Sequence, residues 1–322
     1  MKTIKAISLF SGGLDSSIAA KLIESLGIDV LGISFTTPFF SAEKAIQAAD
    51  LIGIPIKIID FTDDYIQMLK KPRYGFGKNM NPCIDCHALM FKKAGDLMKE
   101  LGYDFIFSGE VLNERPMSQN RISLKKVEKL SGYEGYILRP LSAKLLDITI
   151  PESEGKIDRN KLLNINGRSR KMQFELAEKF NITYYPAPAG GCLLTDKNFS
   201  TRLKDLFSIN PEPKTECLEL LKYGRIFKLQ NDGRLILGRN EKENSAIEKL
   251  NANDFIIDTP EVAGPLGVIL NNYSDENILL AANILVSYCD AETGSEVRVV
   301  CGNNFFKMKK TDKSNYINLL LV

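Results

Sequence analysis

The sequence predicts an α/β protein with an N-terminal parallel sheet, helices on both faces of that sheet, and a smaller α+β domain after it. Three observations predict this fold. Short apolar runs alternate with helical patterns over about the first 110 residues, a glycine turn joins the first strand to the first helix, and strand-like runs separated by turns follow residue 199. Because 322 residues exceed one average domain, we expect domains at 1–199 and 200–322.

The first domain is expected to contain a sheet of near-continuous apolar strands, which is typical of parallel sheets covered on both faces. These strands are expected at Lys5–Phe10, Val30–Phe35, Ile54–Ile59 and Tyr103–Phe107. Apolar residues recur at helical spacing between them, which predicts helices at Asp15–Leu26, Ala42–Ile52 and Cys86–Leu101, and later near Arg170–Phe180. Ligands of such sheets bind beyond the carboxyl ends of the strands, where Ser108-Gly109-Glu110 is expected to lie.

The second domain is expected to mix strands with one apolar helix at Ile278–Tyr288. The expected strands are short and separated by turns, at Arg225–Leu229, Arg234–Leu237, Phe255–Asp258, Val268–Leu270 and Glu296–Val300.

Composition favours a soluble globular protein, since 44% of residues are hydrophobic and 25% are charged. No apolar run reaches the roughly 18 to 20 residues that span a bilayer. The apolar stretch behind Lys2 and Lys5 is too short for a signal peptide and leads at once into the glycine turn. We therefore expect a cytoplasmic protein with no membrane partner.

Basic residues gather in mid-chain, where residues 121–171 hold twelve Lys or Arg against six Asp or Glu. Such a region suits a polyanion such as RNA, although an ordinary solvated surface accounts equally well for charge alone. Residues 200–322 are slightly acidic, with fifteen Lys or Arg against seventeen Asp or Glu. The candidates for phosphate contacts are Arg115, Arg121, Lys125, Lys126, Arg168, Arg170 and Lys171.

The glycine turn is the hexapeptide Ser11-Gly12-Gly13-Leu14-Asp15-Ser16, which lies between the first expected strand and helix. A strand that turns through glycines into a helix directs backbone N–H groups and the positive end of the helix dipole at one point, where an anion binds. Asp15 beside a phosphate needs a cation, and Mg²⁺ is the natural one. The turn matches neither an ordinary P-loop nor a dinucleotide fingerprint.

The hexapeptide resembles the PP-loop of the N-type ATP pyrophosphatase superfamily, whose pattern is Ser-Gly-Gly-x-Asp-Ser. The resemblance implies that Ser11, Gly12, Gly13, Asp15 and Ser16 bind the pyrophosphate of ATP and that Ser34 and Phe35 lie beside the adenosine. Ser108 and Gly109 are expected at the same edge of the sheet. Enzymes with this loop transfer AMP onto a carbonyl oxygen and then let a nucleophile displace it.

The cysteines suggest the nucleophile. Cys83-Ile84-Asp85-Cys86 precedes an expected helix, and Cys192 follows Ala189-Gly190-Gly191. A Cys-x-x-Cys pair can be a redox couple, half of a zinc site or part of an iron–sulfur site. Three cysteines suit a [4Fe–4S] cluster whose open iron holds a sulfide. Structural zinc remains an alternative, with His87 poorly placed as the fourth ligand, and so does a Cys192 unrelated to the pair. Ordinary core cysteines are expected at Cys217, Cys289 and Cys301.

The loop and the cysteines together resemble the tRNA thiolation branch of the superfamily, over about residues 1–200. This branch comprises 2-thiouridylases, 4-thiouridine synthetases and cluster-dependent 2-thiouridine synthetases. The resemblance implies an ATP-dependent tRNA sulfurtransferase that forms AMP and pyrophosphate, with Cys83, Cys86, Cys192 and Asp15 as catalytic residues. It also implies tRNA and a sulfur donor, either sulfide or a persulfide carrier, as partners. Arg139-Pro140-Leu141 resembles a further motif of the branch, whereas Gly109-Glu110 stands where 2-thiouridylases carry Gly-His.

The second domain resembles the RNA-binding domain of ribosome-quality-control proteins. The similar segments are Leu237-Gly238-Arg239-Asn240-Glu241-Lys242-Glu243-Asn244, Asp258-Thr259-Pro260 and Gly264-Pro265. An oligomerisation or capping domain is the alternative.

Three other functions remain open from the sequence. The first is thiolation by a cysteine persulfide without a cluster, the second an ammonia-using ligase, and the third a non-catalytic RNA-binding protein that responds to a nucleotide. The modified uridine, the sulfur donor and the formation of a homodimer are also left open.

Overall fold

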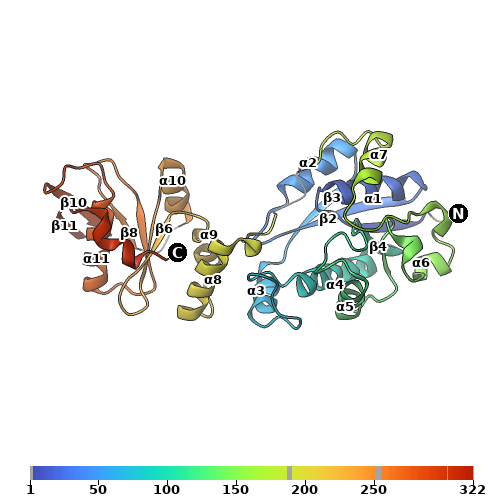
Figure 1. The fold of residues 1–322 in the computed structure, drawn as a ribbon, viewed down its shortest axis with the longest axis horizontal. Helices are drawn as coiled ribbons and strands as arrows, with labels where there is room; N and C mark the ends of the chain where they lie inside the picture. Colours follow the sequence, from blue (N-terminus) through green and yellow to red (C-terminus); the bar gives the residue numbers. More distant parts are fainter. Residues whose placement is uncertain (1–2, 187–190, 251–254, 303, 322) are drawn as a thin grey trace. The chain divides into compact units, whose positions relative to one another are not determined.

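The computed structural model describes residues 3–186, 191–250, 255–302 and 304–321. Its contacts divide the chain into two compact units, Met1–Thr195 and Asp196–Val322 (Figure 1). Within the described part of the chain, no helix has the length and apolar character needed to cross a membrane.

The first unit is built on a five-stranded sheet in the order β3-β2-β1-β4-β5, and every neighbouring pair is parallel. Its strands are β1 (Lys5–Leu9), β2 (Asp29–Thr36), β3 (Ile56–Asp60), β4 (Phe105–Ser108) and β5 (Ile137–Leu138). The central strands β1 and β4 are buried on both faces, which explains their continuous apolar sequence. The sheet confirms the predicted fold class, while β5 was not predicted because two residues carry no periodicity.

Helices cover both faces of this sheet (Figure 1). One face carries α1 (Leu14–Ser25), α2 (Glu43–Ile52) and α7 (Lys171–Lys179), and the other carries α3 (Thr62–Lys70), α4 (Cys83–Leu101) and α5 (Arg121–Ser131). The short α6 (Ile150–Ser153) follows β5. Small residues of α1 and α2, such as Ala19 and Ala49, are fully buried and let the two helices pack closely over the sheet. The helices α3 and α5 were not predicted from the sequence.

The start of α4 corrects one expectation. The helix begins at Cys83 rather than Cys86, so the Cys-x-x-Cys motif forms its first turn instead of preceding it. Pro82 occupies the N-cap, and its carbonyl accepts the Cys86 N–H at 2.8 Å. A proline is well tolerated at a helix start because the N–H groups there have no partner within the helix.

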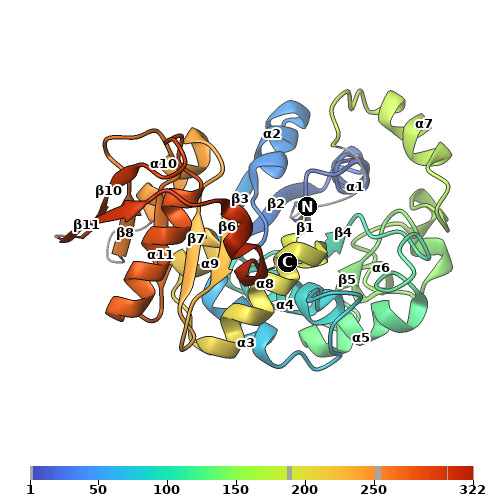
Figure 2. The same cartoon turned by 60° about the vertical axis from the view of Figure 1, so that its left-hand side comes forward.

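The second unit contains a six-stranded antiparallel sheet in the order β11-β10-β8-β9-β7-β6. Its strands are β6 (Arg225–Lys228), β7 (Arg234–Leu237), β8 (Phe255–Asp258), β9 (Gly267–Leu270), β10 (Glu296–Cys301) and β11 (Asn304–Lys309). The apolar helix α11 (Asp275–Ser287) packs against this sheet and supplies much of the unit's core (Figure 2). The remaining helices are α8 (Lys197–Ile209), α9 (Thr215–Leu220) and α10 (Glu241–Leu250). The smaller α+β domain is thereby confirmed.

Candidate active site

The glycine turn leads from β1 into α1, and its backbone requires glycine at Gly12. The φ angle of Gly12 is +73°, and a Cβ atom there would lie 2.3 Å from the Lys44 carbonyl oxygen. Any side chain would therefore be strained and would collide with α2. Gly13 is the N-cap of α1, so the first N–H groups of the helix face the turn without partners inside the helix.

Two serine hydroxyls are gathered around this turn. The Ser16 hydroxyl donates to the Gly13 carbonyl at 2.8 Å, and the Ser11 and Ser16 hydroxyl oxygens lie 3.3 Å apart. The Gly13 N–H points at the Ser11 hydroxyl over 3.4 Å. Together these groups offer several donors for an anion within a few ångströms of one another.

The segment after β4 packs against the glycine turn. Leu9 pairs with Ser108 in the sheet, and a Cβ atom on Gly109 would lie 2.4 Å from the backbone of Asp15 and Ser16. The structure therefore brings the Ser108-Gly109 segment to the glycine turn. Ser34 and Phe35 are buried near the carboxyl end of β2, the strand beside β1.

Asp15 lies among polar side chains that are only partly paired. The Arg170 guanidinium is 3.7 Å from the Asp15 carboxylate and 3.9 Å from the Glu114 carboxylate, and both separations exceed a hydrogen bond. Burial raises the pKa of Asp15, although Arg170, the Gln173 amide and Arg115 oppose the increase. Sequence reasoning missed Glu114 and Gln173, because neither belongs to a recognisable motif.

The three predicted cysteines are brought close enough to interact electrostatically. Cys83 and Cys86 lie three residues apart in the first turn of α4 and so share one side of the helix. Burial raises the pKa of the Cys86 thiol, and the Cys192 and Cys83 thiols raise it further, while a hydrogen bond from Tyr65 opposes them. Burial likewise raises the pKa of Cys192 to about 11, with a contribution from Cys83. Tyr65, a buried residue of α3, was not anticipated at this site.

Hydrogen bonds connect the Cys192 segment to the chain before α4. The Asn79 amide donates to the Thr195 carbonyl at 2.7 Å, and the Leu193 N–H donates to the Phe39 carbonyl at 2.9 Å. The Asn81 amide in turn points at the Cys83 sulfur over 3.2 Å. Of the glycines expected to ease the approach of Cys192, Gly190 lies outside the described residues.

The single histidine, His87, belongs to a buried ion-pair network rather than to the cysteine group. Its Nδ1 atom lies 2.9 Å from the Glu110 carboxylate, and the Arg139 Nε atom lies 2.9 Å from the same carboxylate. Arg139 also pairs with Glu128. Burial opposes ionisation of Glu110, but Arg139 and His87 outweigh it and lower the pKa of Glu110 to about 2. Glu110 is thus placed directly against the histidine of this chain.

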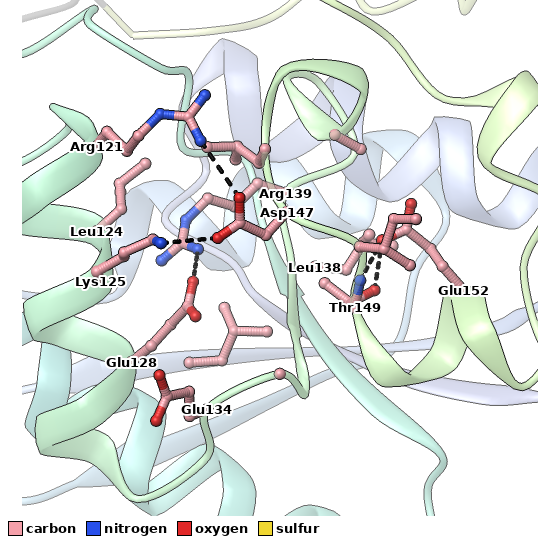
Figure 3. A pocket seen from close by; sticks show the side chains of 15 residues that line it. Arg121, Leu124, Lys125, Glu128, Glu134, Leu138, Arg139, Asp147, Thr149 and Glu152 are labelled. Carbon is pink, nitrogen blue, oxygen red and sulfur yellow. Dashed lines mark hydrogen bonds and ion pairs between the residues drawn. The ribbon is translucent and has the colours of Figure 1, made fainter.

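The basic mid-chain region is partly neutralised by its own carboxylates. Arg121 and Lys125 of α5 both pair with Asp147, and these three residues border a cavity of about 230 Å³ between α5 and the segment around residues 143–152 (Figure 3). Arg159 pairs with Glu152. Arg121, Lys125, Arg168 and Lys171 are all exposed, but Arg121 and Lys125 already share Asp147 as an ion-pair partner.

The arrangement of the three thiols bears on the kind of metal centre that they suit. Within the ranges that the structure describes, no group of three or more His, Cys, Asp or Glu side chains is arranged around a single ion position. A [4Fe–4S] cluster places each thiolate on a different iron, so it does not require three sulfurs around one ion. Cys86 is buried and Cys83 and Cys192 are half-buried, and thiols are the donor type that a soft metal centre deprotonates and binds. The donor set therefore fits such a centre.

Comparison with protein families gives two matches. Residues 4–179 match the model of the tRNA methyl transferase HUP domain, and residues 224–316 match the NFACT protein RNA binding domain. The matches confirm both resemblances that were drawn from the sequence, one for each part of the chain.

Curated relatives include the tRNA-specific 2-thiouridylase MnmA of Francisella tularensis subsp. holarctica. It is 30% identical over 199 residues, which cover 57% of this chain and 55% of the relative. The chain thus spans about half the length of the curated relatives it matches. Among solved structures, a 4-thiouridine synthetase–RNA complex with bound ATP covers 55% of this chain and 51% of its own, at 20% identity and a TM-score of 0.36. A predicted subunit of a tRNA methyltransferase from Methanocaldococcus jannaschii covers 42% and 67%, at 18% identity and a TM-score of 0.33.

Proposed function

Because this chain belongs to the tRNA methyl transferase HUP domain family, we propose that it is an ATP-dependent enzyme that thiolates a uridine of tRNA. The observation that carries the proposal is the combination of a complete Ser-Gly-Gly-x-Asp-Ser turn with three cysteines gathered in the same unit. The turn suits nucleotide activation, and the thiols suit delivery of sulfur. The 30% identity to a tRNA-specific 2-thiouridylase supports the same choice of substrate.

ATP is assigned to the glycine turn. Ser11, Ser16 and the first N–H groups of α1 would hold its pyrophosphate, and Asp15 would hold the accompanying Mg²⁺. Ser34, Phe35, Ser108 and Gly109 border the nucleotide. In the first step, the uridine carbonyl oxygen forms a bond to the α-phosphorus and the bond to pyrophosphate breaks. Donors of the turn stabilise the charge that develops on the leaving pyrophosphate.

The second step replaces the activated oxygen with sulfur. A sulfur nucleophile attacks the adenylated carbon, and AMP leaves with the former carbonyl oxygen. We assign Cys83, Cys86 and Cys192 as the residues that would hold a [4Fe–4S] cluster, which would supply the sulfide nucleophile when bound. The chain's own contribution is to bury Cys86 beside Tyr65 and to leave Cys83 and Cys192 only half-exposed, which limits the water that would compete for the activated carbon.

The tRNA is assigned to both units. The second unit matches an RNA-binding domain, and exposed basic residues such as Arg168 and Lys171 are available in the first for phosphate contacts. The target uridine must leave the base stack to reach the turn and the thiols. A sulfide source or a persulfide carrier completes the set of partners.

The proposal is tested by anaerobic purification with iron and sulfide assays, followed by mass spectrometry of tRNA nucleosides after incubation with ATP and sulfide. We expect about four irons per chain, a thiouridine in the tRNA, and the loss of both in the combined Cys83→Ala, Cys86→Ala and Cys192→Ala variant. Thiouridine formed from ATP and sulfide without iron would overturn the cluster and leave direct attack by sulfide; a persulfide route would instead require a persulfide carrier as the sulfur donor. Stoichiometric zinc with no thiouridine would overturn the proposal and make the thiols a structural site.

A further inference from the structure

Four polar side chains from three separate segments converge beside the glycine turn. Asp15 comes from α1, Glu114 from the segment after β4, and Arg170 and Gln173 from the start of α7. Only Asp15 belongs to the loop motif. The other residues lie about 100 to 158 positions further along the chain, so the fold alone brings them together.

The hydrogen bonding of this group is incomplete. Gln173 is fully buried, yet neither of its amide atoms makes a hydrogen bond of normal geometry, although the amide lies close enough to Asp15 to stabilise its charge. One Asp15 carboxylate oxygen and the Arg170 Nε atom are buried without a hydrogen bond as well. Buried polar atoms are normally paired because each unpaired one costs free energy. Several unpaired buried polar atoms that lie together beside an anion-binding turn indicate a site that is completed by a ligand.

The charges of the group point to the class of ligand. The Asp15 and Glu114 carboxylates share one guanidinium, that of Arg170, at 3.7 and 3.9 Å. Two ionised carboxylates so close to a single cation repel each other. A small divalent cation would bridge two such carboxylates more effectively, since Mg²⁺ is usually held by one or two carboxylates and the oxygens of a bound phosphate.

We propose that Glu114, Arg170 and Gln173 complete the MgATP site, with Mg²⁺ between Asp15 and Glu114 and Arg170 on the pyrophosphate. When MgATP binds, the guanidinium exchanges its two long carboxylate contacts for phosphate oxygens, to which arginine donates paired hydrogen bonds. Gln173 fixes the Asp15 carboxylate in its metal-binding orientation. This inference rests on the proposed use of ATP and adds residues that the loop motif does not contain.

Calorimetric titration of ATP, with and without Mg²⁺, separates the three roles. Arg170→Gln should weaken ATP binding about tenfold in both conditions, because it removes a charged hydrogen-bonding partner of the phosphates. Glu114→Gln should leave the affinity for ATP without Mg²⁺ unchanged. It should abolish most of the increase in ATP affinity that Mg²⁺ causes in the unaltered protein. Lys179→Gln and Glu175→Gln, which change exposed residues of α7, should match the unaltered protein.

Gln173→Leu is the variant that separates a loss of ATP binding from a loss of folding. It replaces unbonded buried polar atoms with an apolar side chain of similar size, so thermal unfolding should be unchanged or shifted upward. Mg²⁺-dependent ATP binding should nevertheless weaken severalfold. A purely structural cluster predicts no change in ATP binding for this variant, and that result would overturn the inference.

The inference and the proposed function fail in different ways. If Arg170→Gln, Glu114→Gln and Gln173→Leu bind MgATP as tightly as the unaltered protein does, the inference is wrong and the proposed function still stands. The absence of any MgATP binding by the unaltered, folded protein would overturn both.

Discussion

Gly12 is the residue at which the backbone most directly constrains the proposed chemistry. Its left-handed backbone turns the chain from β1 toward α1, and its missing side chain lets the turn lie against the Lys44 carbonyl of α2. The motif already specifies a residue with a permissive backbone and no side chain at this position, but only the structure identified α2 as the element that lies against it.

Gly12→Ala should abolish ATP binding and destabilise the first unit. The left-handed backbone alone costs roughly 1–2 kcal/mol for a non-glycine residue, and the collision with Lys44 adds to this. Titration calorimetry and urea unfolding measure the two effects. Gly27→Ala is a matched control, because Gly27 has a φ angle of +79° with nothing within 4 Å of the added Cβ atom. It should lose about 1 kcal/mol of stability and retain ATP affinity; an equal loss of ATP affinity in both variants would contradict the prediction.

Glu110 should make the stability of the first unit depend on pH. Its pKa is lowered from 4.5 to about 2 in the folded protein because Arg139 and His87 outweigh the effect of burial. The ionised carboxylate therefore stabilises the fold above about pH 4.5, and this contribution is lost as the pH falls toward 2.

Glu110→Gln should consequently lower the free energy of unfolding by about 3 kcal/mol at pH 7, since it leaves the Arg139 guanidinium buried with a weaker partner. The difference between the two proteins should shrink progressively between pH 4.5 and pH 2 in urea titrations. Glu100→Gln, at an exposed position of α4, should show no such dependence. A difference that stays constant over this pH range would refute the assignment of the effect to Glu110.

At the scale of single elements, the first turn of α4 joins folding to the cysteine site. Asp85 lies between Cys83 and Cys86, is buried, and accepts the N–H groups of Arg73 and Tyr74 at 2.6 and 3.0 Å. The carboxylate thus holds the preceding segment against the helix, and with it the Asn81 amide that contacts Cys83.

Asp85→Asn should cost about 2 kcal/mol of stability, in the range for lost hydrogen bonds to a charged group. Because the turn that carries both cysteines loosens, iron retained after desalting should also fall relative to the unaltered protein. Urea unfolding and iron analysis measure these quantities. Asp63→Asn, at an exposed acidic position in the first turn of α3, serves as the control. Full iron retention in Asp85→Asn would show that Asp85 does not support the site.

Elements with long, periodic sequences were the most predictable. The apolar runs of β1 and β2 and the helical pattern of α1 agree with the structure to within one or two residues. The strand β5 and the helix α5 were missed. β5 has only two residues, and α5 lies in the basic mid-chain region, for which no helix was predicted.

At the scale of the whole molecule, the chain contains two units with separate cores. The second unit has its own apolar cluster around α11 and its own antiparallel sheet. Such a unit has the anatomy of an independently folding domain.

A fragment of residues 196–322 should therefore fold cooperatively and bind tRNA, whereas a fragment of residues 1–195 should keep ATP binding but bind tRNA more weakly. Circular dichroism during thermal unfolding tests the first expectation, and fluorescence anisotropy with labelled tRNA at several salt concentrations tests the second. A folded 196–322 fragment with no affinity for tRNA would favour an oligomerisation or capping role for this unit.

The sequence by itself determined the fold class, the glycine turn and the identity of the three cysteines. These features depend on local periodicity and on residue types at short fixed spacings, which a chain displays before it folds. Only the tertiary structure decided that Glu114, Arg170 and Gln173 meet Asp15 and that Glu110 meets His87 and Arg139. These contacts join residues far apart in the chain, and parallel strand order and helix packing, rather than any local pattern, bring them together.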